Sequence, residues 1–249
     1  MSRIVDRLDR ALYPRHSSNW DDRIFRDRVL SLISPEAIIL DIGAGAGIVP
    51  QMNFKGMVAK VCGIDLDPRV ERNPMLDEGR LSDAGRIPYP GATFDVALAD
   101  NVMEHLADPM TVLGEVCRVL RPGGVFLFKT PNKTHYMPTI ARMTPHRFHR
   151  FVNRLRGRAE EDTFPTLYRA NTVAAVRKLA ASAGLTVDRL ERIEGRPEYL
   201  RVTWPTYLVG AAYERIVNAF ECLAMFRILL IAELRKPVNS ERGILSWRC

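Results

Sequence analysis

The chain has 249 residues, of which 47% are hydrophobic and 26% charged, and its formal net charge is +7. A chain of this length and composition can bury a core without disulfides or a structural metal. Its four cysteines are scattered and form no CxxC pair, which disfavours a zinc site and indicates a reducing compartment.

The first 35 residues are predicted to be an N-terminal helical segment, and residues 36–249 the main domain. Ile4, Leu8 and Leu12 recur at helical spacing among arginines. The same stretch lacks the apolar core of a secretory leader, and no uncharged run reaches the ~20 residues that a bilayer span takes. We therefore expect a cytoplasmic protein without a transmembrane segment, with peripheral contact at the inner membrane face as an open alternative.

Short apolar runs rich in β-branched residues alternate with helical patterns in the first half of the chain. Such runs predict buried strands. A helix is predicted from Pro109 to Leu120, with proline at its first position and glycines beyond its end. The four predicted strands lie at residues 37–42, 58–64, 94–99 and 125–129.

In the second half, a helix is predicted from Val173 up to Gly184, and strands follow at residues 185–190 and 228–234. Residues 134–166 and 197–226 do not fit the alternation, and we interpret them as two insertions. The pattern indicates an α/β fold with a doubly wound, mostly parallel, seven-stranded sheet of the Rossmann-like type.

A glycine-rich loop that runs from Asp41 to Gly47, with the sequence DIGAGAG, follows the first predicted strand. Such loops lie at the carboxyl ends of parallel strands, where ligands bind. A dinucleotide site has the spacing GxGxxG and binds a pyrophosphate, which the carboxylate of Asp41 would repel. Because Asp41 and the spacing GxGxG suit a ligand with an ammonium group and no phosphate, they favour S-adenosylmethionine over NAD.

Several segments, taken in order, resemble the motifs of class I S-adenosylmethionine-dependent methyltransferases. The resemblance covers roughly residues 36–132 and is closest to the branch that contains the ubiquinone and menaquinone biosynthesis methyltransferases. The segments are residues 38–47 (IILDIGAGAG), 63–67 (GIDLD), 82–96 (SDAGRIPYPGATFDV), 101–106 (NVMEHL) and 118–124 (RVLRPGG).

The resemblance implies a role for individual residues in binding S-adenosylmethionine. The glycine loop is expected to lie against the methionine part, with Asp41 holding its amino group directly or through water. Asp65 is expected to accept hydrogen bonds from the ribose hydroxyls, and Asp83 from the adenine amino group. The full set of expected cofactor-binding residues is Asp41, Gly43, Ala44, Gly45, Gly47, Asp65, Leu66, Asp83, Ala84 and Asn101.

Three residues are candidates for binding or deprotonating the acceptor: His105, His135 and Tyr136. His105 follows the strand that is expected to end near the methyl group, but it also belongs to the shared motif and could only shape the loop. His135 and Tyr136 follow the fourth predicted strand, which faces the acceptor pocket in such folds. We expect no metal. Some similar quinone O-methyltransferases have an additional acid with which they can hold a metal, and this chain has Asn101 at that position.

The two insertions carry the expectations about the acceptor. Seven basic residues and no acid lie between residues 133 and 158, which indicates a solvated face, an anionic acceptor or membrane surface, or nucleic acid. Nucleic acid is disfavoured because no recognised binding motif accompanies the cluster. Residues 205–226 can form an amphipathic helix with a strongly apolar start.

We therefore expect O-methylation of a small-molecule, glycan or lipid-linked acceptor. Two alternatives stay open at this point. One is an NAD(P)-dependent oxidoreductase, and the other is a non-catalytic, cofactor-binding, membrane-associated protein.

Overall fold

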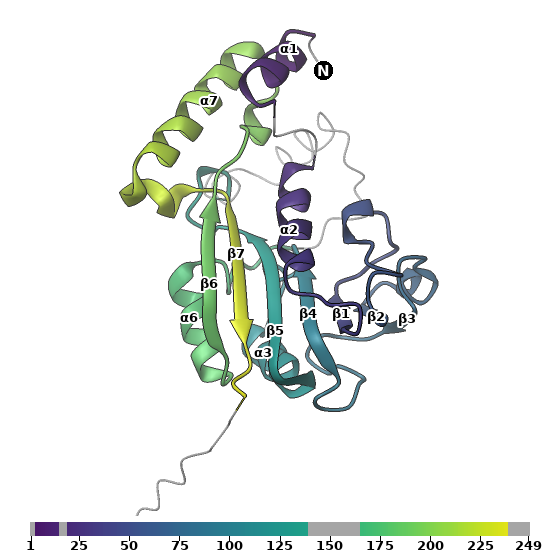
Figure 1. Cartoon of the computed structure of the whole chain (residues 1–249). Helices are drawn as coiled ribbons and strands as arrows, with labels where there is room; N and C mark the ends of the chain where they lie inside the picture. Colours follow the sequence, from purple (N-terminus) through teal and green to yellow (C-terminus); the bar gives the residue numbers. More distant parts are fainter. Residues whose placement is uncertain (1–2, 15–18, 139–164, 239–249) are drawn as a thin grey trace, which may run out of the picture.

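A computed structural model describes residues 3–14, 19–138 and 165–238. Its centre is a seven-stranded sheet in the order β3-β2-β1-β4-β5-β7-β6. All neighbouring strands pair in parallel except β7, which runs antiparallel to both β5 and β6. The sheet is therefore mostly parallel, as the sequence predicts (Figure 1). The strands are β1 (Ile38–Ile42), β2 (Lys60–Asp65), β3 (Glu78–Leu81), β4 (Phe94–Asp100), β5 (Leu120–Pro131), β6 (Thr186–Ile193) and β7 (Leu229–Arg235).

Helices cover both faces of the sheet, which makes the fold doubly wound. Helix α2 lies on one face, and α3 and α6 lie on the other (Figure 1). The helices are α1 (Arg3–Leu12), α2 (Trp20–Leu30), α3 (Pro109–Val119), α6 (Val173–Ser182) and α7 (Trp204–Ala219), and the short 3-10 turns are η1 (Pro50–Met52), η2 (Pro68–Arg72), η4 (Glu198–Leu200) and η5 (Glu221–Phe226).

Alternate residues of each central strand belong to different cores, because side chains on a strand point to opposite faces. Ile39 and Leu98 pack with Phe25 of α2, whereas Leu40 and Ala99 belong to the cluster that α3 and α6 complete. Such strands are apolar on both faces, which explains why they stand out in the sequence as continuous hydrophobic runs.

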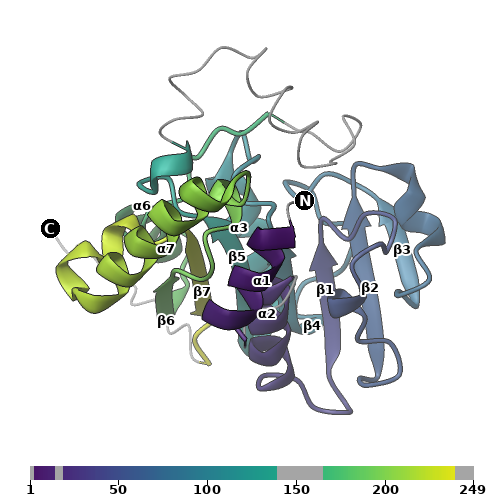
Figure 2. The same cartoon turned by 90° about the horizontal axis from the view of Figure 1, so that it is seen from above.

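The predicted N-terminal helical segment contains two helices with different surroundings. Helix α2 is part of the main core, since Phe25 and Val29 are fully buried in it. Helix α1 packs instead on α7, where Val5 and Tyr13 meet Tyr207 in a small separate cluster. Figure 2 shows α1 and α7 side by side at the end of the sheet where the parallel strands finish.

The second predicted insertion is helical in the structure. Helix α7 begins at a capping box formed by Thr203 and Thr206, and η4 and η5 flank it. Of the first predicted insertion, residues 139–164 lie outside the described part of the chain. Among the helices of the described residues, none has the length and apolar character needed to cross a bilayer.

The main element without a predicted range is β3, at the edge of the sheet. Its sequence, EGRL, is polar and partly exposed, so it lacks the apolar run that marks the central strands. Strands β5 and β6 extend beyond their predicted ranges, and β5 includes the turn at Pro122 because the chain there still pairs with β4 through an irregular register. The α/β class and the mostly parallel seven-stranded sheet are as predicted. The predicted alternation of strands with helices is incomplete in the first half, because only the 3-10 turns η1 and η2 lie between β1, β2 and β3.

Candidate active site

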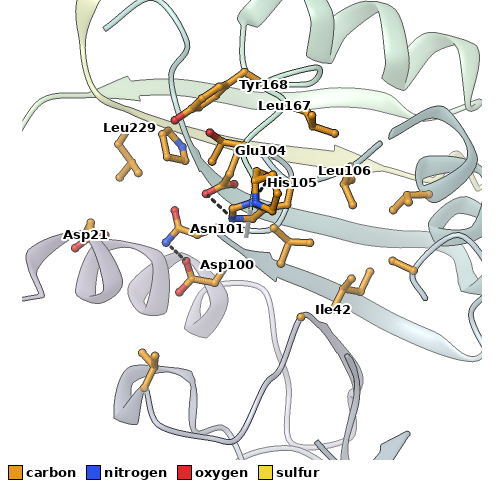
Figure 3. Close-up of a pocket in the computed structure, with 18 of the residues that line it drawn as sticks. Asp21, Ile42, Asp100, Asn101, Glu104, His105, Leu106, Leu167, Tyr168 and Leu229 are labelled. Carbon is orange, nitrogen blue, oxygen red and sulfur yellow. Dashed lines mark hydrogen bonds and ion pairs between the residues drawn. The ribbon is translucent and has the colours of Figure 1, made fainter. Parts of the chain in front are cut away.

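A large cavity of about 1420 Å³ lies where the parallel strands end. The ends of β1, β2 and β4 form one side of it, and residues from α2, from the segment 165–168 and from the stretch before α7 form the other. Figure 3 shows Asp100, Asn101, Glu104 and His105 together on one wall, with Tyr168 beyond them. This is the position at which ligands bind in open parallel sheets.

The glycine loop after β1 is held in a conformation that requires glycine. Gly43, Gly45 and Gly47 all have positive φ angles of 80°, 51° and 72°. A Cβ atom on Gly43 would lie 2.3 Å from Val102 Cγ2, so this position also lacks space for a side chain. The loop is thus a tight backbone turn that leaves room for a ligand beside it.

Asn73, which the sequence does not single out, fixes this loop from the side. Its Nδ2 donates hydrogen bonds to the carbonyl oxygens of Ala44 (3.0 Å) and Gly45 (3.2 Å). A Cβ on Gly47 would lie 2.2 Å from Asn73 Oδ1, so the asparagine and the third glycine fit against each other. Gly47 therefore serves the packing of the loop and does not line the cavity.

Asp65, the last residue of β2, and Asp83, two residues after the end of the neighbouring β3, line the cavity. Asp65 Oδ2 accepts a hydrogen bond from Gly45 N (2.8 Å), and its Oδ1 accepts one from Asp67 N (2.8 Å). Asp83 Oδ1 accepts a hydrogen bond from Gly85 N (2.6 Å). Leu66 and Ala84, which follow these two acids in the chain, also line the cavity, so each carboxylate has an apolar side chain next to it.

Asp41 lies deeper, on β1 below the loop. It is buried, and within the described residues its carboxylate has neither a hydrogen bond nor an ion pair. Burial raises the pKa of Asp41 well above its usual range, and the nearby carboxylates of Asp100 and Asp65 raise it further. Such a group is stabilised by a cation, so the site fits a ligand that brings an ammonium and a sulfonium charge.

The first crossover connection argues against a pyrophosphate ligand. Residues 43–59, all of which the structure describes, contain the short turn η1 and no α-helix. Dinucleotide sites place the pyrophosphate at the N-terminus of the α-helix that follows the glycine loop. Because that helix is missing here and Asp41 lies below the loop, the geometry favours a phosphate-free cofactor.

Lys129 is the most buried charged group of the site, with no exposed side-chain surface. Its ammonium lies 3.1 Å from Asp21, 2.5 Å from Asp22 and 3.0 Å from Asp100. The first two acids belong to the first turn of α2, and Asp100 ends β4. The lysine therefore joins α2 to the floor of the cavity. The three acids raise the pKa of Lys129, although burial alone would lower it.

Asn101 and His105 occupy the wall above this floor. Asn101 has a positive φ of 55° and donates through Nδ2 to Asp100 Oδ1 (2.8 Å). His105 Nδ1 lies 3.0 Å from the carbonyl oxygen of Pro165. A carbonyl oxygen can only accept, so Nδ1 donates this hydrogen bond, while Nε2 lies 3.9 Å from Oε1 of Glu104.

Glu104 connects this wall to the segment 165–168. Its backbone oxygen accepts hydrogen bonds from Leu167 N (2.7 Å) and Tyr168 N (3.1 Å), and its buried carboxylate accepts one from Thr130 Oγ1 (2.8 Å). These hydrogen bonds hold the chain at the end of the first predicted insertion, residues 165–168, beside the cavity.

Tyr136 and His135 differ in position although they are neighbours in sequence. Tyr136 lines the cavity, whereas His135 is 1% exposed and lies behind it. Burial lowers the pKa of His135 to about 3, so this imidazole is neutral at physiological pH. Its Nε2 is 3.5 Å from Oε2 of Glu194, a cavity-lining residue just after β6.

Glu194 is another buried acid of the site, and no sequence pattern predicts it. Its Oε2 accepts a hydrogen bond from Ile228 N (2.8 Å), and burial raises its pKa to about 8. In the unfolded chain a glutamate ionises near 4.5, so the folded state holds this proton more tightly than the unfolded state does. The protonated carboxyl group of Glu194 therefore contributes its full stabilisation below pH 4.5, and this contribution is lost as the pH rises to about 8.

Glu194→Gln is therefore expected to gain stability relative to the wild type as the pH rises. The glutamine is neutral throughout, so the difference in the free energy of unfolding should grow by about 3 kcal/mol between pH 5 and pH 8 and then level off. Urea titrations at several pH values measure it. A difference that stays constant with pH would contradict this prediction, because it would show that burial does not raise the pKa of Glu194.

Two arginines complete the cavity on the side of α7. Arg196 and Arg201 both pair with the buried Asp9 of α1 and with Glu198 of η4. Tyr207 Oη also donates to Asp9 (2.7 Å). This network joins distant parts of the chain and places two guanidinium groups at the cavity. No local sequence pattern predicts their position there.

The structure thus brings most of the predicted residues to one cavity. Gly43, Asp65, Leu66, Asp83, Ala84, Asn101, His105 and Tyr136 line it. The cavity lining does not include Asp41, Ala44, Gly45, Gly47 or His135. In the described residues no three His, Cys, Asp or Glu side chains are arranged to hold a metal ion.

One family model matches part of this chain. Residues 40–128 match the family model described as "Methyltransferase domain". A probable S-adenosylmethionine-dependent methyltransferase from Mycolicibacterium smegmatis is 36% identical over 105 residues, which are 40% of each chain. A ubiquinone biosynthesis O-methyltransferase from Cereibacter sphaeroides is 33% identical over 103 residues, which are 38% of this chain and 41% of the relative.

The alignment with these curated relatives thus spans about two fifths of their length. Among solved structures, the cyclase SpnF has a TM-score of 0.58 at 19% identity, with 90% of this chain and 84% of that chain covered. This similarity concerns the fold alone. The matched segment contains the glycine loop, Asp65, Asp83 and His105, and it ends just before Lys129.

Proposed function

We propose that this chain, which carries the methyltransferase domain of the class I S-adenosylmethionine-dependent enzymes, transfers a methyl group from S-adenosylmethionine to an acceptor bound in the cavity. The observation that carries the proposal is the group of carboxylates of Asp41, Asp65 and Asp83 near the strand ends. Asp41 is buried below the glycine loop and has no ion pair within the described residues. S-adenosylmethionine brings the cationic groups that these carboxylates lack.

The described residues divide the work of holding the cofactor. Asp65 has two oxygens fixed by backbone N–H groups, which orients the carboxylate toward the ribose hydroxyls. Asp83 and Ala84 receive the adenine edge, and Leu66 packs on its face. Asp41 attracts the amino group beneath the loop. Charge-assisted hydrogen bonds of this type contribute about 1.5–3 kcal/mol each.

When bound, S-adenosylmethionine supplies an electrophilic methyl group. The protein's main contribution is to hold the acceptor in line with it, which can lower the barrier by about 7–11 kcal/mol. An oxygen acceptor also loses a proton, and His105 Nε2 is placed to receive it because Nδ1 is engaged with Pro165. Tyr136 binds the acceptor from the opposite side of the cavity, and His135 positions it from behind.

We further propose that the methylated atom is an oxygen of a small-molecule, glycan or lipid-linked acceptor. The O-methyltransferase relative supports the acceptor atom. The wall formed by Tyr136, Tyr168 and Tyr199 offers aromatic surface and hydroxyl groups, and Arg196 and Arg201 offer charge for an anionic head group.

Methyl transfer is tested with S-adenosylmethionine carrying a labelled methyl group and a panel of phenols, catechols, sugars and lipid-linked sugars. We expect label in an ether product, identified by mass spectrometry, and about 100-fold slower transfer in His105→Gln, since general-base catalysis contributes about 10²–10⁴-fold. Label on nitrogen or carbon would contradict O-methylation.

The two alternatives give other results in the same assays. An oxidoreductase would bind NAD and leave the methyl group of the donor in place. A non-catalytic cofactor-binding protein would bind S-adenosylmethionine without transferring label to any member of the panel.

A further inference from the structure

Helix α7 has an apolar surface on its outward side. Its buried face, with Tyr207, Gly210 and Val217, packs on α1 and the body of the domain. A surface helix of this kind ordinarily exposes polar residues. Here, five large apolar side chains on the outward side are 42–66% exposed: Trp204, Leu208, Val209, Ile216 and Phe220.

The apolar surface continues beyond the helix at both ends. Val202 precedes it and is 53% exposed, and Met225 in η5 follows it and is 45% exposed. On the neighbouring α1, Ile4 is exposed to a similar degree. We call these eight residues, Ile4, Val202, Trp204, Leu208, Val209, Ile216, Phe220 and Met225, the α7 face. These residues lie on α7, next to it in the chain or on elements that contact it, and exposed apolar side chains grouped in this way mark sites of contact with proteins or membranes.

Among the described side chains of α1 and α7, the charged ones that are exposed are arginines, whereas the acids Asp6 and Glu214 are partly buried. Arg7 and Arg10 on α1 and Arg215 on α7 are exposed. Among the acids on α7 and in η5, Glu214 accepts hydrogen bonds from Tyr13 and Asn218. Glu221 pairs with Arg227 (3.1 Å) and Arg192 (3.8 Å).

The α7 face begins at the cavity. Arg201 lines the cavity, Val202 is the next residue, and Trp204 starts the helix. Figure 1 shows α7 and α1 together at the end of the sheet where the parallel strands finish, which is the end that carries the cavity. A surface that covers the α7 face would therefore lie next to the cavity.

We propose that the α7 face docks on an anionic lipid surface. The exposed arginines pair with anionic lipid head groups, while the apolar side chains enter the boundary between head groups and acyl chains. A second copy of this chain fits the α7 face less well than a lipid surface does. A symmetric contact through the face would bring the exposed arginines of the two copies together. This inference rests on the proposed function and adds its partner: a membrane that presents an amphiphilic acceptor.

Co-sedimentation of the full chain with vesicles tests the docking. We expect binding to phosphatidylcholine vesicles that contain phosphatidylglycerol, weaker binding to pure phosphatidylcholine, and a decrease with salt. The double variant Val209→Ser/Ile216→Ser should bind the mixed vesicles about tenfold less tightly, since two exposed apolar side chains are removed. Val238→Ser, a 72% exposed valine outside the face, is the matched control and should bind like the wild type.

Three outcomes would overturn the docking. These are a wild type that does not sediment with the mixed vesicles, equal binding by the double variant, or self-association that the double variant abolishes without any vesicle binding. Calorimetry with S-adenosylmethionine on the same preparations separates this inference from the proposed function. Cofactor binding without vesicle binding removes the docking alone, and vesicle binding without cofactor binding removes the proposed donor.

Discussion

Lys129→Met is expected to lower the free energy of unfolding by about 3–5 kcal/mol, because it leaves acids unpaired at the floor of the cavity. Lys129 is fully buried, and its ammonium lies within 3.1 Å of Asp21, Asp22 and Asp100. Methionine keeps most of the side-chain volume, so the change tests the charge more than the packing.

Urea titrations of the wild type and the variant at neutral pH measure this loss. Burial raises the pKa of Asp100 to about 6 even with the lysine present, so the loss should shrink as the pH falls and the acids take up protons. Lys60→Met removes an exposed ion pair with Glu78 and should cost less than about 1 kcal/mol. Equal losses in the two variants would mean that the buried ion pairs do not hold α2 on the sheet.

Asp65→Ala is expected to weaken the binding of S-adenosylmethionine about 10- to 100-fold, since a carboxylate that accepts from the ribose is lost. The affinity is measured by calorimetry. Because Asp65 also accepts from Gly45 and Asp67, thermal unfolding of the same variant shows how much of the loss comes from the loop itself.

Asp67→Ala is the matched control for this change. Its carboxylate lies two residues further on, outside the cavity lining, and accepts from Arg69. The control should bind S-adenosylmethionine with nearly the affinity of the wild type. An equal loss in both variants, or no loss in Asp65→Ala, would contradict the assignment of the ribose site.

The central fold was predictable because its strands are buried on both faces. A strand such as β1 is apolar except for Asp41, and the proline and glycines around α3 mark the ends of that helix. Strand β3 was not located because an edge strand is partly solvated and need not be apolar. Neither did local patterns predict the different positions of His135 and Tyr136, which depend on packing against Glu194 and α7.

The donor side of the site was predictable for a similar reason. Asp65 ends a predicted strand, so its position comes from local sequence and topology together. Asp83 follows β3, which was not predicted, so its expected place came from the family resemblance alone. Lys129, Asn73 and Glu194 act through contacts with residues 28–108 positions away in the chain, which no local pattern reports. Of these, Lys129 carried the one available signal: a lysine at the end of an otherwise apolar strand needs buried acids nearby.

Calorimetric titration of the wild-type chain with S-adenosylmethionine, S-adenosylhomocysteine and NAD tests the assignment of the donor most directly. We predict saturable binding of the first two with one site per chain, and no binding of NAD at comparable concentrations. Binding of NAD, or failure of both sulfur compounds to bind, would contradict the assignment of this cavity to S-adenosylmethionine.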